Sequence, residues 1–111
     1  LSEIGPNRLA ATLREAGVVP RLPPGADPTL PLALGGVGVT LREMVALYAT
    51  LADAGRAAPL RLTPGPMAEA RPVLDPRAAR QVAGVLVNRF PDGGPADIAW
   101  KTGTSWGGRD A

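Results

Sequence analysis

The chain has 111 residues, 45 % of them apolar but only 4 % aromatic, with a formal net charge of +2 and neither cysteine nor histidine. These counts exclude catalysis by a histidine relay or a thiol, exclude disulfides, and leave a structural zinc site without its usual ligands. The length suits one modest domain with a core of Leu, Val and Ala, and polar chemistry must use hydroxyls, carboxylates, arginines, backbone N–H groups or the single lysine, Lys101.

A first helix is predicted to begin at Gly5-Pro6, because proline suits the first helical turn, and to end at Gly17. The apolar positions between them have helical spacing: Leu9, Ala10, Leu13 and Ala16. Residues 18–39 contain five prolines and several glycines, and we expect an irregular, flexible segment there.

The strongest helical pattern runs from about Leu41 to Ala54. It begins with a T-x-x-E capping box formed by Thr40 and Glu43, and Gly55 ends it. One stripe of apolar side chains follows the helical repeat, and we interpret it as core packing: Leu41, Met44, Val45, Tyr48, Leu51 and Ala52.

Two short strands are predicted next, at Leu60–Thr63 and at residues 72–74. Asp75 and Pro76 then read as the N-cap and first position of a third helix that extends to about Arg89. Its apolar positions are Ala79, Val82, Ala83, Leu86 and Phe90.

After a turn-rich break, residues 98–105 are a last strand candidate. The expected fold class is therefore α+β and predominantly helical, with three main helices and two or three short strands.

The last strand candidate carries Lys101-Thr102-Gly103-Thr104-Ser105, which places the only lysine among three hydroxyls and a glycine. A strand edge can bind an extended peptide as an extra strand, and a glycine permits close approach. Strand alternation puts Lys101 and Gly103 on one face and Thr102 and Thr104 on the other, so that they converge on one ligand only at an edge or at the mouth of a cleft. A cation, hydroxyls and backbone N–H groups suit an anion or an oxyanion.

An ordinary solvent-facing strand with a surface lysine would have the same composition, and this alternative stays open. A P-loop is excluded, because it needs glycine directly before the Lys-Thr pair, where Trp100 stands. The arginines are scattered without a basic stripe or interleaved aromatics, so no nucleic-acid partner is expected. No apolar run of 18 residues and no signal peptide occurs, but the chain starts without Met and stops in mid-pattern, so we expect a piece of a longer protein.

Several segments, in this order, resemble the transpeptidase domain of penicillin-binding proteins: Leu34–Met44, Tyr48–Gly55, Val73–Pro76 and Lys101–Ser105. The ending Lys101–Ala111 is similar to the C-type subgroup of the bifunctional class A members. The resemblance covers nearly the whole chain. It implies that residues 1–111 are part of a transpeptidase domain of the penicillin-binding protein/serine β-lactamase-like fold, from just after its S-x-N motif to just after K-T-G.

The family signature combines S-x-x-K, a middle serine motif and K-T-G, with the first serine as nucleophile. Only K-T-G is present here, because the residue three places after Ser2 is Gly5 and that after Ser105 is Gly108. The resemblance therefore implies that this fragment alone lacks the nucleophile and is inactive.

For the full protein, the resemblance implies acyl transfer without cofactor or metal. A serine attacks the D-Ala-D-Ala carbonyl of a peptidoglycan stem peptide, D-Ala leaves, and an amine of a neighbouring stem resolves the acyl-enzyme into a cross-link; β-lactams trap the serine. Lys101 would support the middle serine and attract the substrate carboxylate, Thr102 and Thr104 would bind that carboxylate, Gly103 would admit the substrate backbone, and the Thr104 N–H would serve the oxyanion hole.

The resemblance also places the parent protein on the periplasmic side of the bacterial inner membrane, anchored upstream, with a glycosyltransferase domain outside this chain. An edge strand without its neighbours tends to find a partner, so the fragment is expected to self-associate or to rearrange its C-terminus.

Two other functions remain as alternatives. The first is a serine β-lactamase-like hydrolase, although Glu3 and Asn7 match its E-x-x-L-N motif only with Pro6 in place of Leu, which we interpret as coincidence. The second is a non-catalytic helical interaction domain.

Overall fold

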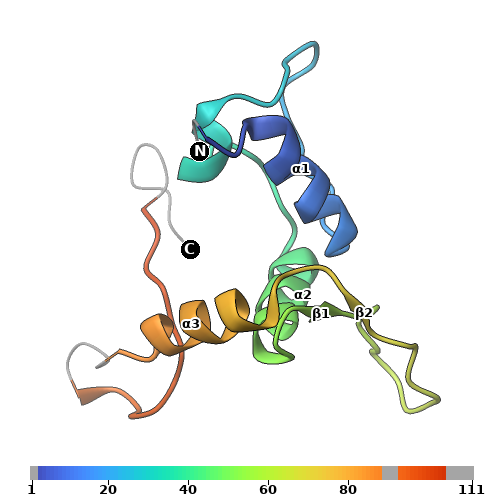
Figure 1. Ribbon diagram of the computed structural model, residues 1–111, viewed down its shortest axis with the longest axis vertical. Coiled ribbons are helices and arrows are strands. Elements are labelled where there is room, and N and C mark those ends of the chain that lie inside the picture. Colours follow the sequence, from blue (N-terminus) through green and yellow to red (C-terminus); the bar gives the residue numbers. More distant parts are fainter. Residues whose placement is uncertain (1–2, 89–92, 105–111) are drawn as a thin grey trace.

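Three α-helices, a 3-10 helix and a two-stranded sheet make up the computed structural model, which describes residues 3–88 and 93–104 (Figure 1). In chain order the elements are α1 (Pro6–Glu15), η1 (Leu30–Leu34), α2 (Leu41–Ala52), β1 (Arg56–Ala57), β2 (Arg71–Pro72) and α3 (Pro76–Leu86). The described part is predominantly helical, as predicted, and it contains a small antiparallel sheet.

The signals for both ends of α1 and for the start of α3 are confirmed. Pro6 opens α1, and the chain leaves it through Gly17, whose φ of 85° favours glycine. The Asp75 carboxylate caps α3 by accepting from the backbone N–H groups of Arg77 and Ala78, both at 2.9 Å. α3 ends at Leu86, three residues before the predicted end.

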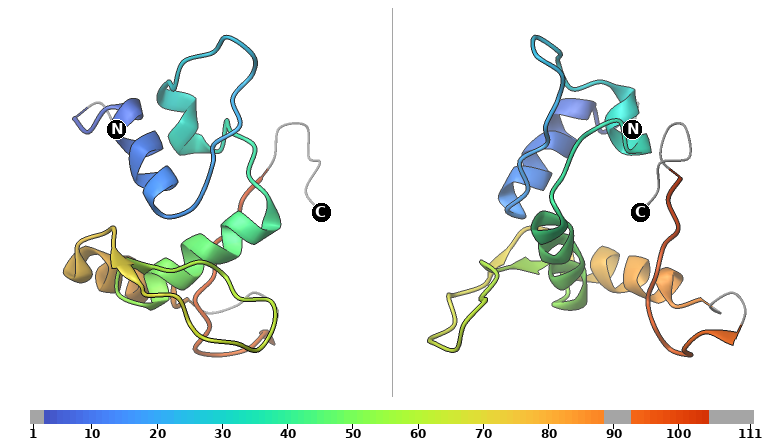
Figure 2. Two further views of the ribbon diagram at one scale, coloured as in Figure 1. Left: turned by 90° about the vertical axis from the view of Figure 1, so that its right-hand side faces the viewer. Right: turned by 180° about the vertical axis from the view of Figure 1, so that it is seen from behind.

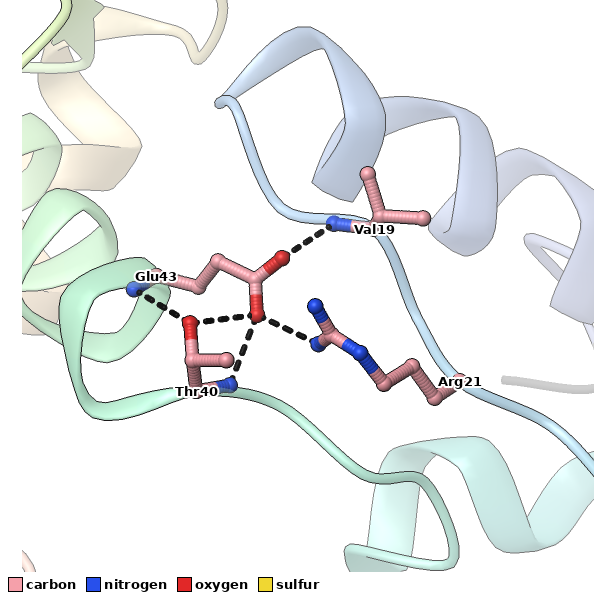
Figure 3. A network of polar contacts seen from close by, with 4 residues as sticks. All are labelled: Val19, Arg21, Thr40 and Glu43. Atoms are coloured by element: carbon pink, nitrogen blue, oxygen red, sulfur yellow. Dashed lines mark hydrogen bonds and ion pairs between the residues drawn. The ribbon is translucent and has the colours of Figure 1, made fainter.

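The capping box of α2 is also confirmed. The Glu43 N–H donates to the Thr40 hydroxyl oxygen at 3.2 Å, while the Thr40 N–H donates to the Glu43 carboxylate at 2.6 Å. The same carboxylate accepts from the Val19 N–H at 3.1 Å and forms an ion pair with Arg21 at 2.7 Å (Figure 3). Glu43 therefore joins the start of the proline-rich segment to the start of α2.

These donors hold the pKa of Glu43 at about 2, below its ordinary value of 4.5; the Arg21 guanidinium is the largest cause, followed by the Thr40 donors and the Val19 N–H. A carboxylate with a lowered folded-state pKa contributes stability that is fully present above pH 4.5 and is lost as the pH falls towards 2.

Replacing Glu43 with glutamine should therefore lower the melting temperature at pH 7, because the charge that binds Arg21 is removed. Thermal unfolding of both proteins from pH 7 to pH 2.5 checks this. The difference between their melting temperatures should stay constant above pH 4.5 and become smaller below it. A difference that is as large at pH 2.5 as at pH 7 would contradict the lowered pKa of Glu43.

Residues 18–39 are irregular for most of their length, as predicted, but they are not a detached linker. η1 forms within them, and the backbones of Arg21 and Gly38 exchange two hydrogen bonds at 3.0 and 3.1 Å. Val18 is fully buried and Leu32 is 5 % exposed. The segment is thus a closed loop that contributes to the core.

The prediction of a strand at Leu60–Thr63 is wrong. The strand forms earlier, as β1, which pairs antiparallel with β2 in the register Arg56↔Pro72 and Ala57↔Arg71. The predicted strand at 72–74 shares only Pro72 with β2. The excursion between β1 and β2 contains prolines 59, 64 and 66, which cannot donate to a ladder, and Leu62 within it is 76 % exposed.

A core of Leu, Val and Ala is confirmed, and it is small. The buried apolar residues among those described are Ala10, Ala16, Val18, Leu32, Ala57 and Ala79. α1 packs against η1, and α2 packs against α3 and β1; the views in Figure 2 show these as two groups joined at the start of α2.

The chain exposes much more surface than its size predicts. Its accessible surface is 8563 Å², whereas a folded monomer of this mass exposes about 5,800 Å². The radius of gyration is 15.2 Å, against about 13 Å for a domain of this length. The chain therefore buries less of its surface than a self-sufficient domain of this mass does.

Candidate functional site

The lysine motif follows a fixed point at the C-terminal end of α3. The Trp100 backbone N–H donates to the carbonyl oxygen of Leu86 at 2.9 Å, and its indole Nε1–H donates to that of Asn88 at 3.1 Å. Val87 and Ala99 form an antiparallel bridge between the same two segments. The chain thus returns to the end of α3 immediately before Lys101.

All four predicted site residues that the structure describes, Lys101 to Thr104, are exposed. The Lys101 ammonium donates to the carbonyl oxygen of Thr102 and lies 3.5 Å from the Thr102 hydroxyl oxygen. The space next to Gly103 is open, since a Cβ added there would meet no heavy atom within 4 Å. A cation and hydroxyls are therefore accessible to an anionic ligand.

The predicted strand over residues 98–105 is wrong for the residues described. Ala99 makes a single bridge, and 101–104 adopt no regular secondary structure. A strand needs a neighbour to satisfy its backbone groups, and within 3–88 and 93–104 none lies beside the motif. The predicted alternation of faces is therefore not formed. Ser105, Trp106, Arg109 and Asp110 lie outside the described residues.

An apolar groove lies between α2 and α3, and Ala99, two residues before Lys101, contributes to its lining. It has a volume of about 360 Å³ and is lined by Val45, Tyr48, Ala49, Leu51, Ala52, Ala83, Leu86 and Ala99. The interpretation of the α2 stripe as buried core is wrong here: Leu41 is 81 % exposed and Val45 48 %. α3 and β1 cover only part of that stripe.

Sequence reasoning missed Trp100 and Asn88 as parts of this arrangement. The Asn88 side-chain amide donates to the Val85 carbonyl oxygen at 2.7 Å, and the Asn88 backbone carbonyl, two residues after α3, accepts from the Trp100 indole. An indole N–H generally finds an acceptor when it is partly buried, but the acceptor here is twelve residues away in sequence.

In the part of the chain that the structure describes, no group of three or more Asp or Glu residues could hold a metal ion. Among the same residues, no helix is both long enough and apolar enough to cross a membrane.

The chain is similar to penicillin-binding protein 1C of Escherichia coli (strain K12). The two are 42 % identical over 117 aligned residues, which cover 100 % of this chain. The chain spans only 15 % of the length of that relative. No protein-family model matches the chain, and no solved structure matches it. The chain is therefore a homologue of one portion of a penicillin-binding protein.

Proposed function

We propose that residues 1–111 are part of the transpeptidase domain of a longer penicillin-binding protein, between its S-x-N motif and the residues just after K-T-G. The observation that carries the proposal is the identity of 42 % along the whole chain to penicillin-binding protein 1C. The Lys101–Gly103 K-T-G sequence, exposed at the end of the α2–α3 unit, supports it.

The proposed reaction is serine acyl transfer between peptidoglycan stem peptides. The serine oxygen bonds to the penultimate D-Ala carbonyl carbon, the peptide C–N bond breaks, and D-Ala leaves with the serine proton on its amine. An amine of a second stem peptide then attacks the ester, gives up its proton, and releases the serine as the cross-link forms.

In this reaction Lys101 carries positive charge towards the substrate carboxylate and the middle serine. Thr102 and Thr104 offer hydroxyls to that carboxylate, and the Thr104 N–H is one donor to the oxyanion. Gly103 leaves room for the substrate backbone, consistent with the open space beside it.

The exposed apolar surface supports a larger domain. The chain exposes more surface than a compact monomer of this mass would, and the apolar groove along α2 and α3 is part of that exposed surface. In the parent protein we place other segments of the transpeptidase domain on this surface.

The parent protein is further proposed to lie on the periplasmic side of the bacterial inner membrane, with an anchor and a glycosyltransferase domain in other parts of its chain. Fractionation of cells that express the full-length protein, followed by protease treatment of spheroplasts, tests the location. Protection from the protease would place the domain in the cytoplasm and contradict the proposal.

Labelling with a fluorescent penicillin tests the function. The full-length protein should take up one covalent label that survives denaturation, and a heat-inactivated sample should take up none. A label that forms and is rapidly hydrolysed would favour the β-lactamase-like alternative. A full-length protein that never takes up label would favour a non-catalytic interaction domain.

The 111-residue chain by itself should take up no label, since it contains no S-x-x-K serine. It should also self-associate, because no segment within residues 3–88 and 93–104 covers its apolar groove. Sedimentation of this chain over a concentration series should show species heavier than 11.4 kDa.

Replacing Tyr48, which lines the groove, with glutamate should shift the chain towards monomer, because a charge there opposes apolar contact. The exposed Arg61, outside the groove, provides the matched control as Arg61→Glu. A monomer at every concentration, or equal shifts from both variants, would contradict self-association through this face.

A further inference from the structure

Trp100 is held at two points, and Lys101 follows it directly. Its backbone N–H donates to the carbonyl of Leu86, the last residue of α3, at 2.9 Å, and its indole N–H donates to that of Asn88, two residues beyond the helix, at 3.1 Å. One bond fixes the position of the backbone, and the other fixes the direction of the side chain. We propose that Trp100 is a positioning residue that sets the placement of Lys101 relative to α3 for acyl transfer. This inference rests on the proposed function.

The backbone carbonyls at the C-terminal end of α3 need hydrogen-bond donors from outside the helix. The last four carbonyls of a helix have no partner within it. The Asn88 side chain satisfies the Val85 carbonyl at 2.7 Å, and the Trp100 N–H satisfies that of Leu86. The indole N–H donates to the carbonyl of Asn88, two residues after the end of the helix. Trp100 is thus attached by two hydrogen bonds to the helix end and to the residues that follow it.

Nothing after Trp100 provides a comparable fixed point in the described residues. Lys101–Thr104 have no regular structure and are exposed, and the one contact of the lysine described here is with its own neighbour Thr102. Adjacent Cα atoms are about 3.8 Å apart, so any rotation at residue 100 moves Lys101 directly. Because catalysis depends on the fraction of molecules in the productive geometry, a looser Trp100 lowers the rate.

The experiment uses the full-length protein and a fluorescent penicillin. Trp100→Phe keeps an aromatic ring but removes the indole donor. We expect its acylation rate constant at saturating penicillin to fall about three- to tenfold, the effect of one hydrogen bond, while the penicillin concentration for half-maximal rate changes little. Thr12→Val, which removes one side-chain bond to the Arg8 carbonyl in α1, is the matched control and should acylate at the wild-type rate.

A double-mutant cycle of Trp100→Phe and Lys101→Ala distinguishes an effect of Trp100 on the position of Lys101 from a general loss of protein stability. If Trp100 acts through Lys101, then Trp100→Phe should have no further effect on the slow acylation of a Lys101→Ala protein. The same fold-loss in both backgrounds, or no loss in the wild-type background, would overturn the inference.

Incorporation of 3-benzothienylalanine at position 100 keeps the shape of the indole and replaces N–H with sulfur, so it covers the case in which Trp100→Phe fails to fold. It should reproduce the loss of rate, and a wild-type rate would overturn the inference. A wild-type protein that takes up no label at all would instead overturn the proposed function, and this inference with it.

Discussion

Replacing Lys101 with alanine in the full-length protein is expected to lower the rate of acylation by a labelled penicillin about 100- to 1,000-fold. Such a loss is typical when a positioned proton-transfer group or a charge near the developing oxyanion is removed. Lys101 is the single lysine of the chain and is exposed to an incoming ligand. The measurement is the time course of covalent labelling at several penicillin concentrations.

Two variants sharpen this result. Arg80→Ala removes an exposed cation from α3 and should label at the wild-type rate, which controls for a general change in charge. Lys101→Arg keeps the charge but not the compact ammonium, and it should recover only part of the rate. Labelling of Lys101→Ala as fast as wild type would remove Lys101 from the proposed mechanism.

Replacing Gly55 with alanine should destabilise the region around β1, β2 and α3 by about 2–5 kcal/mol, from left-handed backbone strain and overpacking together. Gly55 has a φ of 87°, and a Cβ there would lie 2.6 Å from the Leu74 carbonyl oxygen. The Gly55 carbonyl also accepts from the N–H groups of Val73 and Leu74, at 2.9 and 3.0 Å. The added methyl group would therefore push apart the segments that these bonds join.

Hydrogen exchange followed by mass spectrometry provides a local measurement. The Val73 and Leu74 amides should exchange faster in Gly55→Ala than in the wild type. Gly84→Ala is the control, because Gly84 lies within α3 with open space around it. This second variant should slow exchange in α3, since alanine favours a helix by about 1 kcal/mol over glycine. Unchanged exchange at 73–74 in Gly55→Ala would contradict the account of that turn.

Features that depend on near neighbours could be predicted from the sequence. The Thr40–Glu43 capping box and the Asp75 N-cap each involve residues two or three apart, so the local sequence contains both partners. Gly17 likewise ends α1 because of its own backbone freedom.

Features that depend on partners distant in the sequence could not be predicted. The sequence of Leu60–Thr63 does not show that the strand forms at Arg56–Ala57 instead. The position of that strand depends on its pairing with residues 71–72 and on the hydrogen bonds from Val73 and Leu74 to the Gly55 carbonyl. The apolar period of α2 predicts a buried face but does not say which segment covers it.

The candidate site also has one part that the sequence predicts and one part that it does not. The Lys-Thr-Gly sequence itself pointed to an anion-binding role, whereas its anchoring could not be foreseen. Trp100 bonds to residues twelve and fourteen positions earlier, and no periodicity encodes that distance. The missing strand has the same origin, since the ladder it needs is a long-range structure.

Because the bridge between Arg21 and Gly38 closes the loop of residues 22–37, that loop should accept inserted residues. Two backbone hydrogen bonds and the Glu43 ion pair fix the ends, so an insertion at the far tip need not disturb them. Gly25 is such a tip: it is exposed, with open space around it. Doubling the length of a flexible loop costs only about 0.6 kcal/mol in closure entropy. Gly25 is therefore a suitable place for an epitope or a fluorescent label that leaves the lysine motif untouched.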